Sequence, residues 1–572
     1  MALVAPREAQ NLGIGRKPMK TVPTHPHMVQ GVHRRTVLKA VLATSVTLST
    51  WSLPLSPGLW GAAAGQPKRG GILRVRGDDP PHFDPHQTNS FKTHTTLSFV
   101  YSKLVRHKVG AEIPPGTFIV EPDLAERWEA LDDTTYVFHL RKGVTWHNKP
   151  PLNGRELVAE DVTFTYDRFL TTQGNPLRFM LEPVDRLEVV DRYTVKFFLK
   201  EPYVWLVNAL AYPWGMWIIA PEVVQHFGDL KKPESAIGTG PFLLERYEPN
   251  VKTVFKRNPD YFRTGQPYVD GVEWLVLEDD STGLAMYRTG QIDWGPWHNG
   301  TVRQQDLEAL KKTHPTLVYQ DFLSNVPEVI FMRTDQPPFH DVRVRRAISH
   351  AIDRQGLIEA VWGRGEPTPA VARGLTEWSL PIDQLGAGAR YYQYDPKEAK
   401  RLLAAAGHPK GFKTQLTVSS GFGRDTVDDA QLVQRFLKDV GIEAELKIQE
   451  HSAYVATTVQ GKYEGMVRGP YGTALEPDIP LYRAYAPESA TNIGHVNDPK
   501  LRAMLKEQRR TQDLEVRKKL IFAIQRYAAE QQYYVYTNVV MLTGSWQPYV
   551  KNYAPNQTFD YGGRAAALWL DR

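Results

Sequence analysis

The chain has no cysteine among its 572 residues, and this absence excludes several classes of protein. A disulfide framework, a thiolate zinc site, a cysteine nucleophile and a lipid anchor on an N-terminal cysteine are all ruled out. The remaining composition, with 42% hydrophobic and 23% charged residues, is neither that of a disordered chain nor that of a fibrous one. The length then predicts more than one folded unit, each with a sizeable core.

Net charge is also absent from most of the chain, although the whole sequence carries a formal charge of +6. The first 64 residues hold seven basic side chains and one acidic side chain, so the remainder is neutral. A neutral remainder gives no electrostatic attraction for a polyanion. The sequence therefore predicts no nucleic-acid partner.

Residues 1–64 have the features of an export signal. A basic stretch ends in Arg34-Arg35, no charged residue occurs between Ala40 and Pro67, and Ala62-Ala63-Ala64 supplies small residues for cleavage. The arginine pair with the Thr-Val-Leu-Lys that follows resembles the twin-arginine translocation signal, which is read by a receptor. We therefore expect an exported, periplasmic protein without a lipid anchor, starting at Met1 or Met28. A disordered tail with a chance Arg-Arg pair is the alternative.

Hydrophobic periodicity predicts an α/β protein with mixed sheets flanked by helices. The expected strands lie at 72–75, 136–140, 193–197, 414–418 and 442–448, with a hairpin over 242–255. Expected helices lie at 158–170, 395–406 and 513–530, with another between the last two strands. Asp395 and Pro396 are typical of a helix start, and Gly407 and Gly441 are typical of helix ends. The strand, helix and strand over 414–448 predict a βαβ unit.

The sequence lacks the contiguous motifs of common enzyme classes. It has no H-E-x-x-H zinc-protease motif, no G-x-S-x-G nucleophile elbow, no phosphate-binding loop and no complete dinucleotide fingerprint. Adjacent carboxylates occur at Asp279-Asp280 and Asp428-Asp429, where solvated turns and helix starts explain them better than an acid/base pair does. We therefore expect no enzymatic activity and no cofactor, and a secreted hydrolase is the alternative.

One short segment has the residue types of a metal site. His82, Asp84 and His86 fall within five residues, and all three side chains are ligands for divalent ions. The prolines beside them indicate a rigid loop instead. We therefore expect no metal site here.

Nine short blocks of sequence carry more information through their order than each does alone. Three of them are Phe83-Asp84-Pro85-His86, Gly238-Thr239-Gly240-Pro241-Phe242 and Asn258-Pro259-Asp260-Tyr261-Phe262. The others cover 124–128, 138–147, 159–166, 290–293, 337–348 and 395–407. Together, over about residues 70 to 545, they resemble the periplasmic peptide/nickel-binding family, the solute-binding proteins of family 5 that serve ABC importers.

The resemblance implies a two-lobed periplasmic-binding-protein fold of type II, with an extra inserted domain and a ligand cleft between the lobes. One lobe would combine a discontinuous base domain (65–107, 234–333 and 541–572) with an inserted domain (108–233), and the other would cover 334–540. The implied function is capture of a peptide or peptide-like small molecule by hinge closure, followed by delivery to ABC permease subunits in the inner membrane. We expect a monomer. A binding protein that feeds a sensor is a second alternative to this function.

Aromatic and polar residues near the implied cleft are the candidate ligand contacts. Aromatic walls with a few polar groups suit a small-molecule cleft, and arginine forks suit a ligand carboxylate. The residues expected to bind ligand are Tyr212, Trp214, Trp294, Trp297, Arg373, Arg468, Tyr471, Thr473 and Asn492. Core packing of the aromatic residues and solvation of the arginines are the alternatives.

One position departs from the pattern of the peptide-binding members. In those members an Asp four residues before a Pro holds the α-ammonium group of the peptide, whereas Thr473 stands at that distance before Pro477. The nearest acidic residue is Glu476. A buried ammonium group without a carboxylate partner is costly. The departure therefore favours a modified peptide, an amino-acid conjugate, an opine, an oligosaccharide or a metal chelate over a peptide with a free N-terminus.

Overall fold

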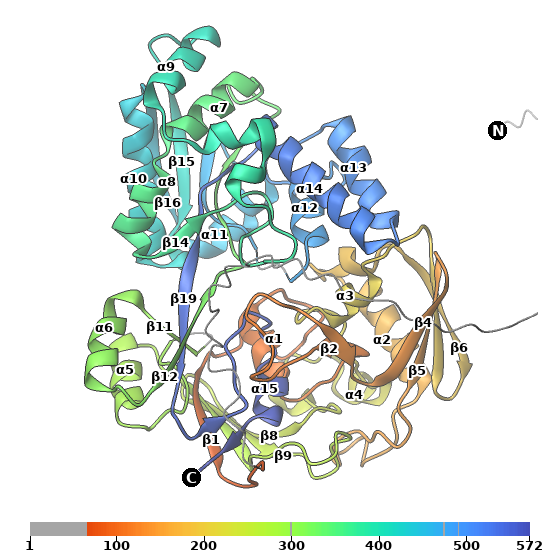
Figure 1. Ribbon diagram of the computed structural model, residues 1–572. Helices are drawn as coiled ribbons and strands as arrows, with labels where there is room; N and C mark the ends of the chain where they lie inside the picture. Colours follow the sequence, from red (N-terminus) through yellow and green to blue (C-terminus); the bar gives the residue numbers. More distant parts are fainter. Residues whose placement is uncertain (1–65, 298–299, 473–474, 490) are drawn as a thin grey trace, which may run out of the picture. The chain divides into compact units, whose positions relative to one another are not determined.

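The computed structural model describes residues 66–572 except 298–299, 473–474 and 490. The expected export signal over 1–64 lies outside these residues. In the described part of the chain no helix is long and apolar enough to cross a membrane. Strands and helices are interspersed along the chain and form several separate sheets (Figure 1), which confirms the mixed α/β class.

The first sheet joins the start of the described chain to a hairpin far along the sequence. β1 (Ile72–Gly77) pairs in parallel with β10 (Gly271–Val276), which pairs antiparallel with β9 (Lys252–Arg257). β9 continues the hairpin that begins with β8 (Phe242–Glu248), as expected over 242–255. Phe99 stacks on Phe255 of this sheet with their ring centroids 4.5 Å apart.

The second sheet is antiparallel and lies within the expected inserted domain. Its order is β4 (Ala125–Asp132), β5 (Thr135–Leu140), β7 (Thr194–Leu199) and β6 (Val184–Asp191). Helix α2 (Ala159–Thr171) contacts β6 and β7 and buries Val162, Tyr166 and Phe169. The strands expected at 136–140 and 193–197 and the helix expected over 158–170 are thereby confirmed. We call these two sheets and the elements around them lobe 1.

Lobe 2 is built on a five-stranded sheet. Its order is β16 (Ile442–Gln449), β15 (Phe412–Ser419), β17 (Met466–Pro470), β13 (Glu328–Met332) and β18 (Val535–Tyr536). β15 is parallel to both β16 and β17, and α10 (Arg424–Asp439) connects β15 to β16, so the expected βαβ unit is confirmed. α7 (Val342–Ala351), α9 (Pro396–Ala405) and α10 bury their apolar faces with the sheet in one cluster.

Two segments connect the lobes. β12 (Val318–Leu323) pairs with β19 (Asn538–Trp546) in lobe 1, and the chain then enters β13 of lobe 2 through residues 324–327. The return path runs from β18 through Thr537 into β19, the long strand that passes between the two groups of elements in Figure 1. β13 pairs with β17 and β18 of the five-stranded sheet, although it lies before residue 334.

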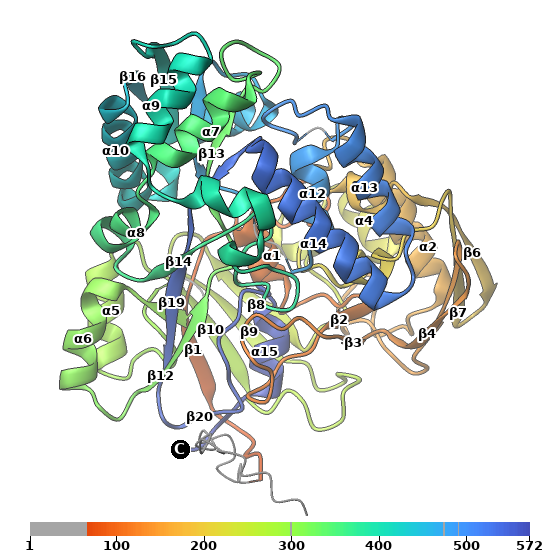
Figure 2. The same ribbon diagram turned by 45° about the horizontal axis from the view of Figure 1, so that its top comes forward.

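Three helices of lobe 2 lie against lobe 1. α12 (Asp478–Tyr485), α13 (Pro499–Arg510) and α14 (Leu514–Gln531) follow the five-stranded sheet, and Figure 2 shows them beside the helices of lobe 1. The Val204 N–H donates to the Arg509 carbonyl at 2.9 Å across this boundary. α14 matches the helix expected over 513–530.

The remaining elements are short. In lobe 1 they are α1 (Phe91–Leu97), β2 (Val105–His107), β3 (Val120–Pro122), α3 (Leu206–Ala211), α4 (Pro221–Phe227), α5 (Asp280–Arg288), β11 (Thr301–Val302), α6 (Gln304–Thr313), β20 (Val550–Lys551), α15 (Tyr561–Ala567) and β21 (Trp569–Leu570). In lobe 2 they are α8 (Arg354–Leu357), β14 (Gly365–Pro367), which pairs with β19, and α11 (His451–Ala456).

Candidate functional site

The carboxyl ends of β15, β16 and β17 meet at one edge of the lobe 2 sheet because these three strands are parallel. Open α/β sheets bind ligands outside this edge. Phe422 follows β15, His451 and Tyr454 follow β16, and the Phe422 ring meets both of those rings edge to face at 5.1 and 5.7 Å. The loop after β17 begins with Tyr471 and leads into α12.

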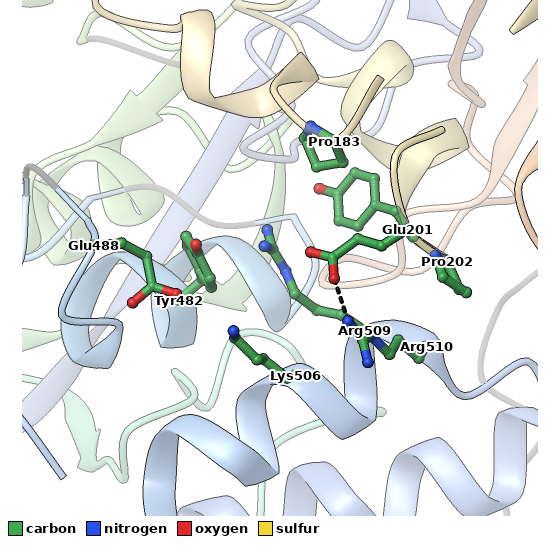
Figure 3. A pocket seen from close by; sticks show the side chains of 9 residues that line it. Pro183, Glu201, Pro202, Tyr482, Glu488, Lys506, Arg509 and Arg510 are labelled. Carbon is green, nitrogen blue, oxygen red and sulfur yellow. Dashed lines mark hydrogen bonds and ion pairs between the residues drawn. The ribbon is translucent and has the colours of Figure 1, made fainter. Parts of the chain in front are cut away.

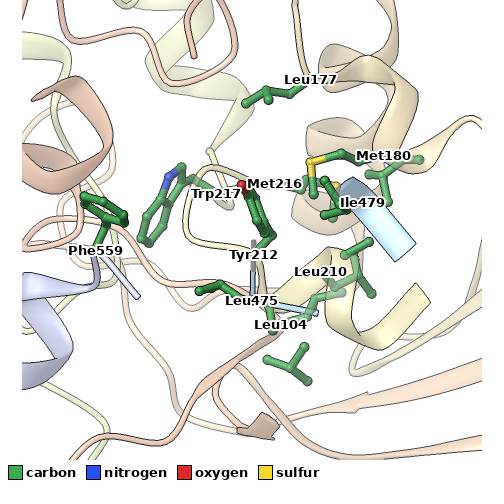
Figure 4. Packing of buried hydrophobic residues seen from close by; sticks show 14 of the residues in the cluster. Leu104, Leu177, Met180, Leu210, Tyr212, Met216, Trp217, Leu475, Ile479 and Phe559 are labelled. Carbon is green, nitrogen blue, oxygen red and sulfur yellow. The ribbon is translucent and has the colours of Figure 1, made fainter. Parts of the chain in front are cut away.

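An aromatic group in lobe 1 lies opposite the loop after β17. Tyr212 ends α3, and its ring meets the Trp214 ring edge to face at 5.8 Å. Trp214 also contacts Phe559 at 5.6 Å. Figure 4 shows Tyr212 above Leu475 of lobe 2, with Trp217 and Phe559 on one side and Ile479 on the other, all within one buried cluster. We call Tyr212, Trp214, Trp217 and Phe559 the aromatic wall.

Buried polar groups hold the aromatic wall in place. The Trp217 Nε1–H donates to His94 Nδ1 at 3.1 Å, and His94 Nε2 lies 3.0 Å from the Thr88 carbonyl. Burial lowers the pKa of His94 to about 4, so the ring is neutral at pH 7 and Nδ1 is available to accept. On the other side of Trp217 the Lys103 Nζ lies 4.2 Å from the ring centroid. Burial lowers the pKa of Lys103 to about 8.

The two lobes are in contact at this site. Tyr212 and Trp217 share one buried apolar cluster with Leu475 and Ile479, which flank the start of α12. Tyr212 from lobe 1 and Tyr471 from lobe 2 both lie near the positive charge of Arg483, which opposes the rise that burial causes in the pKa of each phenol. Tyr212 meets Trp214 ring to ring, and Tyr471 shares the neighbouring charge of Arg483 with Tyr212. The role of these three residues toward a ligand stays a prediction.

A second contact between the lobes lies at the end of α13. The Trp205 Nε1–H donates to Gln508 Oε1 at 2.9 Å, and the Gln508 amide donates to Asp478. The Arg509 guanidinium pairs with Asp478 at 2.9 Å and lies 4.8 Å from the Tyr203 ring. A cavity of about 60 Å³ lies beside them, and Figure 3 shows the Glu201–Arg510 ion pair at its rim. We call this contact the α13 seam.

Arg468 is fully buried and bound within lobe 2. Its Nη2 lies 2.8 Å from Asp429 Oδ2 and 3.0 Å from the Thr537 hydroxyl, and its Nε donates to Asp429 Oδ1. Its Nη1 lies 3.8 Å from Glu328 Oε2. The guanidinium therefore has two carboxylate neighbours from its own lobe, beneath α10.

Arg373 and Asn492 likewise have partners in the protein. Arg373 donates to Glu366 at 3.3 Å and to the Ser379 carbonyl at 3.2 Å. The Asn492 side chain donates to the Val496 carbonyl at 2.8 Å and accepts from the Val496 N–H at 2.9 Å, so it closes its own loop. The hydrogen bonds of these two residues and of Arg468 go to other groups than the aromatic wall, and their role toward a ligand stays a prediction.

Trp294 and Trp297 lie in another part of lobe 1. Trp294 is buried, and its ring stacks on Tyr553 at 5.1 Å. Trp297 is half-buried, with the Arg303 guanidinium 4.0 Å from its ring centroid. Thr473 is outside the described residues.

The acidic residue nearest to Thr473, Glu476, caps the start of α12. Glu476 is buried, and its carboxylate accepts from the backbone N–H of Asp478 and, at 2.8 Å, from that of Ile479. Burial and the neighbouring charge of Asp478 raise the pKa of Glu476 to about 8. Glu476 thus caps a helix, and Asp478 is paired with Arg509.

A metal-site candidate and a Ser-His pair both take part in interactions that hold the protein's own structure. Asp84 is buried and pairs with Arg168 at 2.6 Å, and the described residues contain no group of three or more His, Asp or Glu side chains suited to a metal ion. A Ser-His pair exists at Ser419 and His451, 3.0 Å apart. The Ser419 hydroxyl is buried and accepts from the Gly421 N–H, as the cap of a short turn.

Phe559 belongs to the site but was not predicted from the sequence. It lies in the C-terminal tail, about 340 residues after the Trp214 that it contacts. The density of aromatic residues in this tail, at Trp546, Tyr549, Tyr553, Phe559 and Tyr561, is the signal that indicates a role for it.

Comparisons with known proteins agree on one family of binding proteins. The family model for bacterial extracellular solute-binding proteins, family 5, matches residues 120–492. The dipeptide-binding protein of Escherichia coli is 28% identical over 438 residues, which cover 72% of this chain and 78% of that protein. The di/tripeptide-binding protein 1 of Pseudomonas aeruginosa is 29% identical, with 79% and 86% covered.

Two solved structures share the fold. One is the periplasmic binding protein DppA from Helicobacter pylori in complex with the peptide STSA, with a TM-score of 0.72, 24% identity and coverage of 88% of this chain and 99% of that chain. The other is AgaA from A. tumefaciens R10 in complex with agropinic acid, with the same values for all four measures.

Proposed function

Since this chain belongs to family 5 of the bacterial extracellular solute-binding proteins, we propose that it captures a peptide or peptide-like solute between its lobes and delivers the solute to an ABC permease. Lobe 1 and lobe 2 are the two lobes of this periplasmic-binding-protein fold. The observation that carries the proposal is the aromatic wall of lobe 1, which faces the loop after β17 at the carboxyl edge of the lobe 2 sheet.

Lobe closure gives such a carrier its mechanism. A solute that contacts both the aromatic wall and the loop after β17 binds the closed form better than the open form, and only this difference shifts the equilibrium. At micromolar affinity the binding free energy is about −8 kcal/mol, which is enough to bias a closure equilibrium of a few kcal/mol. Trp205 and Gln508 at the α13 seam add a contact that belongs to the closed form.

The chemistry of the loop after β17 narrows the solute class. The two acidic side chains that follow Thr473 are engaged, because Glu476 caps α12 and Asp478 pairs with Arg509. A peptide ammonium group at Thr473 would therefore lack the carboxylate that its burial requires. We propose a solute whose amino end is modified or absent, such as a conjugated amino acid, an opine or a blocked peptide.

The location and partners follow from the same proposal. We propose that the twin-arginine segment exports the chain to the periplasm, where it acts as a monomer without a lipid anchor and docks on permease subunits. We also propose the division into a base domain (65–107, 234–327 and 541–572), an inserted domain (108–233) and lobe 2 (328–540). The start of lobe 2 is moved to Glu328 because of the strand pairing of β13.

Mass spectrometry of the protein purified from periplasm tests the proposal. Native spectra are expected to show a bound small molecule that denaturing spectra release, and Trp214→Ala is expected to reduce its occupancy several-fold. Tyr394→Ala, an exposed aromatic residue of lobe 2, is the control and should retain the solute. A wild-type protein that carries no solute, and that binds none of a panel of peptides and amino-acid conjugates, would contradict the proposal.

A further inference from the structure

A polar cavity of about 390 Å³ lies on the five-stranded sheet of lobe 2, and no residue of the aromatic wall lines it. Gln415 and Thr417 of β15 form part of its floor, on the sheet face opposite α10, because they alternate with Leu416, which packs with α10. Lys447 and Gln449 of the neighbouring strand β16 also line it, and Thr417 lies opposite Lys447 in the strand register. We call this space the β15–β16 cavity. Its volume is within the range of small-molecule sites, about 300–1,000 Å³.

The β15–β16 cavity lies at the surface of lobe 2. Farther along the same sheet face, Phe331 of β13 and Val467 of β17 belong to the buried cluster that includes residues of α12, α13 and α14. β16 is the edge strand of the sheet, and its Glu445 and Lys447 are exposed on this face. A ligand therefore reaches the cavity without any opening of the lobes.

The turn that follows α11 forms one side of the cavity and is closely fitted to the sheet. The Gln449 side-chain amide donates to the Thr457 hydroxyl at 3.0 Å and accepts from the Thr458 hydroxyl at 2.7 Å. Gly465 ends the turn with φ of +72°, and a Cβ at this position would lie 2.5 Å from the Gln415 carbonyl oxygen. Only glycine permits this approach. The polar groups on this side of the cavity are therefore held in position by the protein itself.

Two hydroxyl groups of the lining have no hydrogen-bond partner in the described part of the chain. Thr417 is 3% exposed, and its hydroxyl makes no hydrogen bond there. The Tyr463 hydroxyl is buried and likewise lacks a partner among the described residues. Buried polar groups without partners are costly, and native proteins contain few of them. The lining therefore has hydrogen-bonding capacity that a ligand can use.

The residue types of the lining match the chemistry of a saccharide. Each hydroxyl of a sugar both donates and accepts hydrogen bonds, and glutamine amides and threonine hydroxyls do the same. The lining offers these groups at Gln415, Thr417, Gln449, Thr457 and Thr458. The Tyr463 ring adds an apolar surface of the kind on which the C–H face of a sugar ring packs.

The charged residues at the cavity do not favour a strongly charged ligand. Lys447, Lys462 and Glu464 are exposed, so both signs of charge occur around the opening. Exposed charges are screened by solvent and contribute little to affinity. The uncharged hydrogen-bonding groups of the floor and of the turn therefore determine which ligand fits.

We propose that the β15–β16 cavity is a second binding site, which takes a mono- or disaccharide or the terminal sugars of a glycan chain. The inference goes beyond the proposed function, because the lining comes from lobe 2 alone and the site is filled independently of the solute between the lobes. Lobe closure is not needed to form it. Binding of the sugar therefore leaves the closure equilibrium unchanged.

Saturation-transfer NMR with maltose, cellobiose and diacetylchitobiose tests the site, and titration calorimetry measures the affinity of each sugar that binds. At least one of these sugars is expected to bind the wild type. Thr417→Val keeps the branched shape of the side chain and removes its hydroxyl, so it is expected to weaken binding by about 5- to 100-fold. Gln415→Met, at a half-buried position of the same floor, is expected to weaken binding as well. Thr414→Val is the matched control, because Thr414 belongs to the same strand and does not line the cavity.

The control should bind the sugar as the wild type does, and the sugar-free melting temperature of Thr417→Val should equal that of the control. No binding of any of the three sugars by the wild type would overturn the proposal. Wild-type affinity in both Thr417→Val and Gln415→Met would overturn it as well. Wild-type retention on immobilised cellulose or chitin would identify the end of a glycan chain as the ligand, and binding of the free disaccharide alone would identify a free sugar; either result supports the site.

Trp214→Ala separates this site from the proposed solute site. The variant is expected to lose the solute between the lobes and to bind the sugar with unchanged affinity. Loss of sugar binding in Trp214→Ala, or displacement of the sugar by the solute released from the wild type, would overturn the second site and leave solute capture standing. A wild type that binds the sugar but no solute would contradict the proposed function and leave the second site standing.

Discussion

Arg468 and Asp429 form a fully buried ion pair beneath α10, with Glu328 as a second carboxylate at 3.8 Å. Removing one member of a buried pair leaves the other charge uncompensated, which costs about 3–5 kcal/mol. We therefore expect Asp429→Asn to lower the free energy of unfolding by about 3 kcal/mol, measured by urea denaturation. Asp428→Asn, at a half-exposed neighbour, should change it by less than about 0.5 kcal/mol. Equal losses in the two variants would show that Asp429 does not stabilise the lobe through its charge.

Glu328 makes the stability of the folded protein depend on pH. Burial raises its pKa from 4.5 to about 7, although the charge of Arg468 opposes the rise. The folded protein therefore holds this proton at pH values where the unfolded chain has released it. The resulting stabilisation is complete below the unfolded pKa and is lost as the pH rises through about 7.

Glu328→Gln removes this titration. Between about pH 5 and about pH 8 the wild type is expected to lose stability relative to the variant, as measured by the melting temperature at each pH. Parallel pH profiles for the two proteins would contradict the assignment of a raised pKa to Glu328.

The position of Arg468 also shows what one sequence does not reveal about a site. Arg468 was expected to lie on a loop of lobe 2 with its guanidinium on a ligand carboxylate, whereas it lies in strand β17 and pairs with Asp429. Its carboxylate neighbours are 39 residues earlier in the chain for Asp429 and farther still for Glu328. No local pattern marks either as a partner, because strand pairing and the packing of α10 bring them together.

At the scale of elements, the α13 seam joins lobe 1 to the helix that follows the proposed solute loop. Gln508 on α13 accepts from Trp205 of lobe 1 and donates to Asp478, the first residue of α12, directly after the loop that faces the aromatic wall. Gln508→Met leaves the buried Trp205 N–H without its acceptor, which costs about 1–3 kcal/mol in the closed form. We expect the solute to dissociate about 5- to 100-fold faster, as measured by stopped-flow displacement.

Lys506→Met is the control for this seam. Lys506 is exposed and lines the same cavity. Its substitution should leave the dissociation rate unchanged. Equal rates for Gln508→Met and the wild type would mean that the seam does not hold the closed form together.

Elements with strong local signals were predictable, and their partners were not. α9 begins at Pro396 because the Asp395 side chain accepts from the N–H groups of Lys397 and Glu398, and Gly407 ends the turn with φ of +93°. Each of these signals lies in residues at or next to the end of the helix that it determines. By contrast, the pairing of β1 with β10 joins segments about 200 residues apart, and nothing in either strand specifies the other.

At the scale of the whole molecule, the family blocks predicted the architecture because their order along the chain reflects that of a complete fold. They predict two lobes and an insertion, and this division stays a prediction, with β13 paired into the five-stranded sheet although it precedes residue 334. They did not indicate Phe559, since it lies in the tail beyond the last block. Sites that distinguish one member from another are where family patterns are least informative.

Small-angle X-ray scattering with and without solute tests ligand-linked closure of the lobes most directly. Tyr212 and Leu475 belong to a buried cluster that spans both lobes, and Trp205 donates to Gln508 across the α13 seam, so the proposed closure would break or form these interactions. We predict that removing the solute increases the radius of gyration and that adding it back restores the smaller value, because the solute favours the closed form. The same radius of gyration at full and at zero solute occupancy would contradict capture by closure.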